Sequence, residues 1–513
     1  MLKSIQLLYS DRICQNYIAI FFIFQPYFEE AIHLKKITQI TLAALLAAPV
    51  TLGSLSLPAS VSAASATPAG QTTSQAVKGP VAQAPSVYTE SAADYAQFLQ
   101  AKYNIQLPKQ LTKGDFIKAI ATVLEADQAA PATDDASGSE VKAPAFTDLN
   151  SNDSAYKAAA SLYNNGILSG TEVRANDKLS TYAAVFIAVK AAGFKELAYT
   201  YPEDKTAKAL EKLGVSSSRV QGQAAQELAA AIDTGLIPES LYPALRKGGE
   251  ASSDFANILL GRVLTSQGKY KNEIGRSGDA DIYSKLYAAY RTADLIEAPE
   301  LRTIVDQALR NDLVTGYNLK DSRFDSNFID ELTLTYGHDD IKHAVQLIGL
   351  LRSEGIDADV QFQPKTSAFI YLKEWGEPKE TPDYKVTQIE NGNYIAYAKE
   401  YDIQFEFNNT ADKARFNDII LKYAKKNSDD TSALIHASWW QPLYYSPTAL
   451  AEYPVIANNK ISLGNYYAQS FSLKENSKAI QEGFRKLAPD ADISSYTFWV
   501  DHPFFNYLNG ESE

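Results

Sequence analysis

The chain has 513 residues and a formal net charge of −13, from 48 basic and 61 acidic side chains. Hydrophobic residues make up 45% and charged residues 21%, which is typical of a folded globular protein and excludes wholesale disorder. The acidic balance argues against a general nucleic-acid binder, because such a protein needs a basic surface. The single cysteine, Cys14, excludes an internal disulfide and a thiolate zinc site.

The N-terminal presequence, 1–63, has the pattern of a secretory signal rather than of a folded domain. In its second part, 34–63, a short basic segment precedes an apolar stretch, and small residues end the segment at Ala63. This order predicts a cleaved signal peptide. A transmembrane anchor is the alternative, but Pro49 and Gly53 interrupt the apolar stretch. Residues 1–33 fit this pattern badly, and we expect them to lie upstream of the true translation start.

Composition divides the rest of the chain. Residues 64–87 are rich in Ala, Thr, Gln, Pro and Ser and predict a flexible linker. Helical segments follow over 88–270, and a helical connector is expected at 271–330. From 331 to 513 helical and strand-like segments alternate, which predicts an α+β domain. The fold class we expect is therefore an all-α region followed by an α+β domain.

The α+β domain is predicted from local periodicity. Apolar residues recur at helical spacing over 341–351, and Ile403–Phe407 alternates apolar and polar residues as a half-buried strand does. Residues 358–362 and 368–372 are expected to form two separate strands. The predicted architecture is a mostly antiparallel sheet that carries its helices on one face, with no membrane span once the signal is removed.

The segment 146–194 contains the clearest unit of an internal repeat. Phe146-Thr147-Asp148 precedes a short helix, and the glycine-containing turn 165–170 follows it. The carboxylate of Asp148 is placed to cap a helix start, and glycine permits the left-handed conformation that ends a helix. Weaker copies of the pattern occupy about 88–126 and 200–265.

These units resemble the S-layer homology (SLH) repeat of Gram-positive surface proteins. That repeat runs Phe-x-Asp, helix, Gly-Ile-x-x-Gly, and then a Thr-Arg-Ala-Glu-like motif that opens a second helix. The unit at 146–194 matches the first half but has Ser180-Thr181-Tyr182-Ala183 at the basic–acidic motif. The unit at 88–126 lacks an evident Phe-x-Asp start but keeps Thr112-Lys113-Gly114-Asp115. The resemblance implies three repeats that pack as a pseudo-trimer.

The resemblance also implies non-covalent binding to a pyruvylated secondary cell-wall polysaccharide. A pyruvate ketal is a carboxylate, and a cation at a helix N-terminus adds its charge to the free backbone N–H donors there. The ligand-binding residues that we predict are Lys113, Gly114, Asp115, Asp148, Gly170 and Arg174. Lys113 is the best supported of these and Arg174 is second, although a solvated helix-start lysine is an equal alternative for Lys113.

All four tryptophans of the chain lie in its C-terminal half. Trp439 and Trp440 are adjacent, and neighbouring strand positions point to opposite faces, so one ring is a candidate for stacking on a sugar. Packing in the core is the alternative for each of them, as for any large aromatic side chain.

Enzyme and cofactor motifs are missing from the sequence. His338 and His343 are five residues apart rather than the four of a zinc-binding helix, and no phosphate-binding loop, nucleophile elbow or dinucleotide fingerprint occurs. We therefore predict no cofactor, no metal and no catalytic residue. Glu374 and Asp501 could be posed as a glycosidase pair, but nothing in the sequence fixes their separation.

Together these features predict a non-enzymatic, exported protein of the cell wall or S-layer of a Gram-positive bacterium. Its expected partners are wall polysaccharide and further copies of itself in a surface lattice, with no nucleic acid. The alternative is a wall-anchored enzyme that acts on polysaccharide or peptidoglycan through its C-terminal domain.

Overall fold

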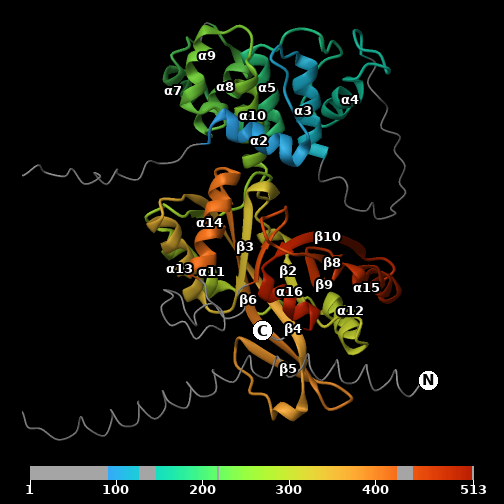
Figure 1. Ribbon diagram of the computed structural model, residues 1–513. Coiled ribbons are helices and arrows are strands. Elements are labelled where there is room, and N and C mark those ends of the chain that lie inside the picture. Colours follow the sequence, from blue (N-terminus) through green and yellow to red (C-terminus); the bar gives the residue numbers. More distant parts are fainter. Residues whose placement is uncertain (1–89, 126–145, 217–218, 424–442, 511–513) are drawn as a thin grey trace, which may run out of the picture.

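The computed structural model describes residues 90–125, 146–216, 219–423 and 443–510, which form a helical region and a sheet region (Figure 1). The predicted presequence, the predicted linker at 64–87, and Trp439 and Trp440 lie outside the described residues.

The helical region is built around one apolar core to which its helices contribute buried faces, including Leu99, Phe116, Val185 and Leu260. The segments that lead into three of the helices run side by side. The Leu179 N–H donates to the Leu111 carbonyl at 3.0 Å, and the Ala251 N–H donates to the Leu179 carbonyl at 2.7 Å. The helices are α2 (Ala92–Tyr103), α3 (Lys113–Glu125), α4 (Tyr156–Asn164), α5 (Thr181–Ala191), α6 (Lys195–Tyr199), α7 (Glu203–Leu213), α8 (Gly222–Asp233), α9 (Tyr242–Lys247) and α10 (Ser253–Ser266).

The sheet region is a closed antiparallel barrel. Eight strands pair in the ring order β4-β2-β9-β8-β10-β7-β3-β6, and β6 pairs again with β4. Two strands lie outside the ring, β1 beside β4 and β5 beside β6. The strands are β1 (Gly275–Arg276), β2 (Gly316–Asp321), β3 (Thr333–His338), β4 (Ala358–Tyr371), β5 (Tyr384–Gln388), β6 (Tyr394–Phe407), β7 (Leu443–Ser446), β8 (Val455–Leu463), β9 (Tyr466–Ser472) and β10 (Asp492–Val500).

Helices cover the outer surface of the barrel. On one side α11 (Ile282–Thr292), α13 (Ile341–Ser353) and α14 (Thr410–Tyr423) pack against β3, β4 and β6, and on another α12 (Pro299–Arg310) and α15 (Lys474–Leu487) pack against β2, β8 and β9 (Figure 1). A last helix, α16 (His502–Asn509), packs against the inner face instead: its Phe504, Phe505 and Leu508 contact the cluster of Ile456, Phe498 and Tyr445, and the Tyr445 hydroxyl bonds Asp402 inside the barrel. Among the described helices, none is both long and apolar enough to span a bilayer.

Alternation along β4 separates an apolar outer face from a polar inner face. Val360, Phe362 and Ile370 belong to the apolar clusters beneath the helices. The intervening Gln363 and Lys365 are also buried, but they face the barrel interior and contact side chains from other strands there. The polar half of the alternating pattern is therefore enclosed rather than exposed to solvent.

The predicted fold class is wrong. The sheet is not open with one free face. The 14-residue strands β4 and β6 pair along their whole lengths, and on their other edges β4 pairs with β2 and β6 pairs with β3. The remaining strands complete the ring. Strand twist makes such closure available to long strands. The structure does not show the predicted pseudo-trimer of all-α repeats either. The helix α4 has 9 residues and α8 has 12, and α6 and α7 separate α5 from α8.

Residues 267–276 join the two regions and contact both. The ring of Tyr270 packs against Phe98 of α2, with centroids 4.6 Å apart. The next residue, Lys271, forms ion pairs with Asp359 of β4 at 2.6 Å and with Glu406 of β6 at 2.5 Å. The two regions are thus held together by apolar packing on one side of the connection and by buried charges on the other.

Candidate functional site

The start of α3 is pressed against the loop that precedes α5. The N–H groups of Lys113 and Gly114 donate to the carbonyls of Asp177 and Ala175, each at 2.8 Å. A Cβ on Gly114 would lie 2.9 Å from the Ala175 carbonyl oxygen, so only glycine permits this approach. Two backbone donors that were expected to receive a carboxylate ligand are therefore already used inside the protein.

Asp148 organises the same loop from the other side. Its carboxylate accepts hydrogen bonds from the N–H groups of Val173 at 2.8 Å and Arg174 at 2.5 Å, and these bonds lower the pKa of Asp148. Arg174 adopts a left-handed backbone conformation, with φ of 57°, and its Nε lies 2.8 Å from Asp177 Oδ2. The role of Asp148 here is to hold the loop rather than to cap the helix that follows it.

Lys113 and Arg174 are the two cations of this arrangement, which we call the α3 loop site: Lys113, Asp148, Arg174 and Asp177. Partial burial lowers the pKa of Lys113, the nearby Arg174 lowers it further, and Asp148 and Asp177 oppose that change. The ammonium of Lys113 makes no hydrogen bond or ion pair within the described residues, whereas the side chain of Arg174 is 62% exposed and paired with Asp177. The site thus offers two cations to an anionic ligand: the ammonium of Lys113, and the guanidinium of Arg174, whose charge Asp177 partly compensates.

Two other predicted ligand residues, Asp115 and Gly170, have structural roles outside the α3 loop site. Asp115 accepts hydrogen bonds from the hydroxyl of Thr112 at 2.7 Å and from its N–H at 3.2 Å, and it pairs with Lys118 at 3.1 Å. These contacts cap α3. Gly170 has φ of 92° and open space around the position of a Cβ, so it serves the turn.

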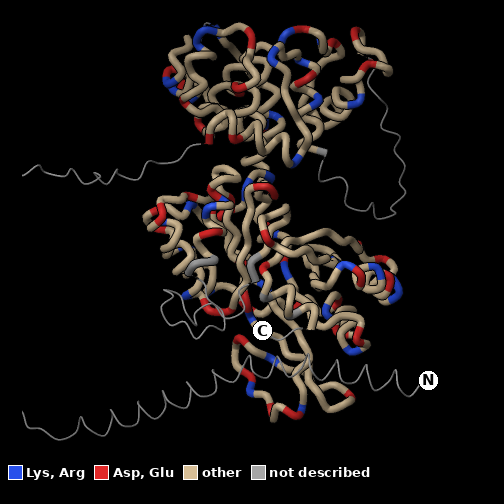
Figure 2. Tube along the Cα trace, in the orientation of Figure 1, with Lys and Arg blue, Asp and Glu red and all other residues tan. Residues whose placement is uncertain are grey.

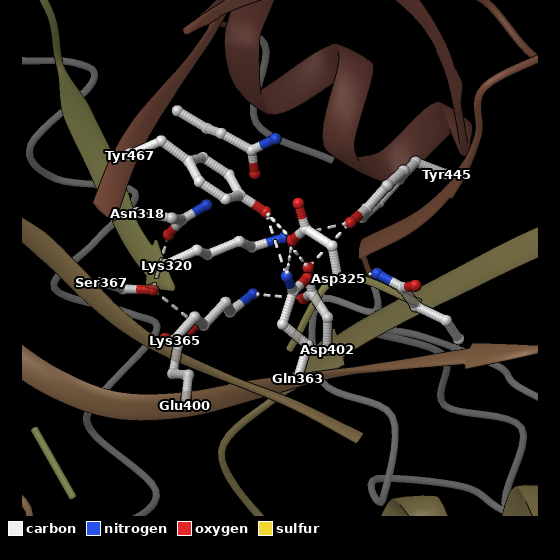
Figure 3. Close-up of polar contacts among 12 residues, drawn as sticks. Asn318, Lys320, Asp325, Gln363, Lys365, Ser367, Glu400, Asp402, Tyr445 and Tyr467 are labelled. Atoms are coloured by element: carbon white, nitrogen blue, oxygen red, sulfur yellow. Dashed lines mark hydrogen bonds and ion pairs between the residues drawn. The ribbon is translucent and has the colours of Figure 1, made fainter. Parts of the chain in front are cut away.

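A second polar cluster lies inside the barrel, where no site was predicted from the sequence (Figure 3). Lys320 of β2 and Lys365 of β4 both form ion pairs with Asp402 of β6, the second at 2.9 Å. The Tyr445 hydroxyl donates to the same carboxylate at 2.7 Å. Close by, Asp325 accepts a hydrogen bond from the Tyr467 hydroxyl at 2.6 Å.

These groups have strongly altered protonation equilibria. Burial alone would raise the pKa of Asp402, but Lys320 and Lys365 reverse this and lower it. Burial lowers the pKa of Lys320, although Asp402 opposes the change, whereas Asp402 and Glu400 overcome burial and raise the pKa of Lys365. The cluster is charged and internally compensated, and its charges belong to residues far apart in sequence, so no local motif reports it.

The two histidines that were considered as metal ligands are buried side by side at the end of β3. The rings of His338 and His343 have centroids 3.8 Å apart. His338 Nδ1 accepts from the Asp340 N–H at 2.9 Å, at the start of α13, and His343 Nδ1 lies 2.9 Å from the Tyr336 hydroxyl. Burial and His338 lower the pKa of His343 from 6.5 to about 3.

We expect His343 to make the protein sensitive to acid. An unfolded histidine gains its proton near pH 6.5, whereas the folded one resists protonation down to about pH 3, so stability falls as pH decreases between these values. Denaturant titrations should show a loss of about 2–3 kcal/mol between pH 7 and pH 4.5. His343→Gln should reduce this loss, whereas the exposed His502→Gln should not; equal pH profiles for all three proteins would contradict the assignment.

The posed glycosidase pair has other positions. Glu374 lies in the short 3-10 helix Lys373–Trp375, in the connection between β4 and β5. Asp501 is buried and accepts a hydrogen bond from the Phe504 N–H at 3.1 Å, which caps α16. Asp501 therefore has a structural role at a helix start.

Lys and Arg positions are interspersed with Asp and Glu positions over both regions (Figure 2). The α3 loop site is consequently a local arrangement within a mixed surface rather than part of a broad basic face. The chain matches no family model, no curated protein and no solved structure.

Proposed function

We propose that the protein is exported and is held non-covalently on the cell surface of a Gram-positive bacterium through an anionic wall polysaccharide that binds its helical region. The observation that carries this proposal is that Lys113 and Arg174, 61 positions apart in the sequence, both contact Asp177: the Lys113 N–H donates to its carbonyl at 2.8 Å, and the Arg174 Nε lies 2.8 Å from its carboxylate. A carboxylate such as a pyruvate ketal can receive charge-assisted hydrogen bonds from both. On this proposal the barrel faces outward, and further copies of the protein are lattice partners.

The backbone contacts limit how the ligand is bound. The N–H groups of Lys113 and Gly114 are occupied by loop carbonyls, so the proposed binding relies on side-chain cations and not on free donors at the α3 start. Because Asp177 already pairs with Arg174, the unpaired ammonium of Lys113 is expected to contribute most of the affinity. A low affinity for each site fits a protein with a net negative charge that approaches an anionic polymer.

The test is retention of the exported chain on purified cell walls. Lys113→Ala should weaken binding about tenfold, since removal of one charge-assisted hydrogen bond costs about 1.5 kcal/mol or more. Lys118→Ala is the matched control, because Lys118 lies on the same helix and pairs with Asp115 outside the α3 loop site. Equal binding by the two variants would remove the site assignment, and unchanged binding to pyruvate-stripped walls would remove the proposed ligand.

A further inference from the structure

Most of one edge of β10 has no neighbouring strand. On one side β10 pairs with β8 from Asp492 to Trp499, whereas on the other side it pairs with β7 only through Trp499 and Val500. Figure 1 shows β10 at the margin of the group that it forms with β8 and β9. The barrel ring therefore closes over two residue pairs, and along 492–498 no described strand pairs with this edge of β10.

The direction of the backbone groups shows what this edge offers. The Val500 N–H points to the β8 side, where it donates to the Pro454 carbonyl at 3.0 Å. Alternate residues of an antiparallel strand direct their N–H and C=O groups to opposite sides, so those of Ile493, Ser495 and Thr497 point to the free edge. These groups have no hydrogen-bond partner in the part of the chain that the structure describes. Each of the three residues thus offers one donor and one acceptor to a further strand.

The sequence of β10 does not protect this edge. Exposed edges are usually blocked by charges, by proline or by a covering segment, yet 493–500 contains no charged residue and no proline. A second edge strand, β5, is blocked by its own chain. The Val386 N–H donates to the Glu380 carboxylate at 3.0 Å, and the Tyr384 N–H donates to the Thr381 carbonyl at 3.3 Å. The open edge of β10 therefore indicates a partner strand.

A second copy of the chain fits this edge through antiparallel pairing of β10 with β10. When Ser495 lies opposite Ser495 of the second copy, Ile493 lies opposite Thr497, and all three outward-facing residues are paired across a two-fold axis. The nearest charged residue, Asp492, then lies opposite Phe498 and far from its own counterpart. No like charges meet along the paired strands, so the edge is complementary to itself.

Tyr496 adds apolar area to this contact. It is 38% exposed, although its ring packs against Phe498 with centroids 5.1 Å apart. In the register centred on Ser495, Tyr496 lies opposite Ser494 of the second copy and diagonal to its Tyr496, which is within reach of an aromatic ring. We propose that two copies of the chain associate through their β10 edges into one continuous sheet, and that copies held on the wall meet through this contact. The second part rests on the proposed function, whereas the pairing itself is measurable in solution.

The experiment measures the association of the exported chain by analytical ultracentrifugation over a range of concentrations. The wild type should form a dimer with a dissociation constant of about 10 μM, as expected for a small interface. Ser495→Lys and Ser495→Asp should each weaken association about tenfold or more, because each places two like charges opposite each other at the two-fold axis. An equimolar mixture of the two variants should associate again, since opposite charges then face each other.

Controls separate this edge from other contacts. Thr387→Lys adds the same charge at an exposed position of the blocked strand β5 and should leave association unchanged. Lys113→Ala should associate as the wild type does, so failure of the wall-binding proposal would not affect this result. If the Ser495 variants do not fold, hydrogen exchange of the wild type replaces them, and the amides of Ile493, Ser495 and Thr497 should exchange more slowly in the dimer.

Four results would each overturn the proposal. They are a wild type that stays monomeric at about 200 μM, unchanged association of the Ser495 variants, no recovery in a mixture of the folded variants, and equal exchange of the three amides in monomer and dimer.

Discussion

Asp402→Asn is expected to lower the free energy of unfolding by about 3–5 kcal/mol, because it leaves buried ammonium groups without their counter-charge. Asp402 is 1% exposed and lies between Lys320 and Lys365. Lys365 keeps a second partner, Glu400, at 3.3 Å, so Lys320 is the group left without compensation. Urea denaturation followed by circular dichroism measures the loss.

Two further variants show whether the loss comes from the buried charge. Lys320→Met should cost less than Asp402→Asn, since Asp402 then keeps Lys365 and Tyr445 as partners. Asp492→Asn, at the exposed start of β10, should change stability by less than about 0.5 kcal/mol. A loss below about 1 kcal/mol for Asp402→Asn would show that the interior tolerates unpaired ammonium groups.

Gly261→Ala is expected to destabilise the helical region by about 2 kcal/mol, although alanine normally favours a helix over glycine. Gly261 lies in α10, where a Cβ would come within 1.9 Å of the Tyr95 ring of α2. Tyr95 is itself buried and packs against Tyr270 with centroids 5.0 Å apart, so the ring has no room to move away. Thermal or chemical denaturation of the variant tests this.

A glycine in a similar helical position provides the matched control. Gly349 lies within α13, and a Cβ added there would have the Tyr283 hydroxyl oxygen as its nearest neighbour at 3.7 Å, an ordinary contact. Gly349→Ala should therefore stabilise the protein by about 1 kcal/mol. The opposite signs expected for two helical Gly→Ala changes depend on helix packing alone, and equal signs would contradict the close approach of α2 and α10.

Local periodicity predicted individual elements well and their assembly poorly. The helix expected at 341–351 is the core of α13, because its apolar spacing depends only on nearby residues. The two strands expected at 358–362 and 368–372 are one strand, β4, which continues through Gln363, Pro364 and Lys365. A polar stretch with a proline resembles a loop, yet over 361–364 β4 pairs with β6 alone and its polar side chains face other polar side chains.

The candidate sites show the same limit. Lys113, Asp148 and Arg174 each belong to a short local motif, so these residues were identifiable before their geometry was known, although their contacts were not. The interior cluster joins Lys320, Lys365 and Asp402, whose only common property is their position in the ring of strands. Neither the composition nor the spacing of these residues reports that they meet.

The connection between the two regions determines how a pulling force would pass through the molecule. A protein held at its helical region and pulled at its barrel transmits tension through residues 267–276. That segment joins the barrel through β1, which pairs with β4 over only two residues, and through the ion pairs of Lys271 with Asp359 and Glu406. Arg276 of the same segment also pairs with Asp357 and Asp359, and the Asn327 amide donates to the carbonyls of Lys269 and Tyr270. The mechanical strength of the junction therefore depends on ion pairs and side-chain hydrogen bonds more than on the two-residue pairing of β1.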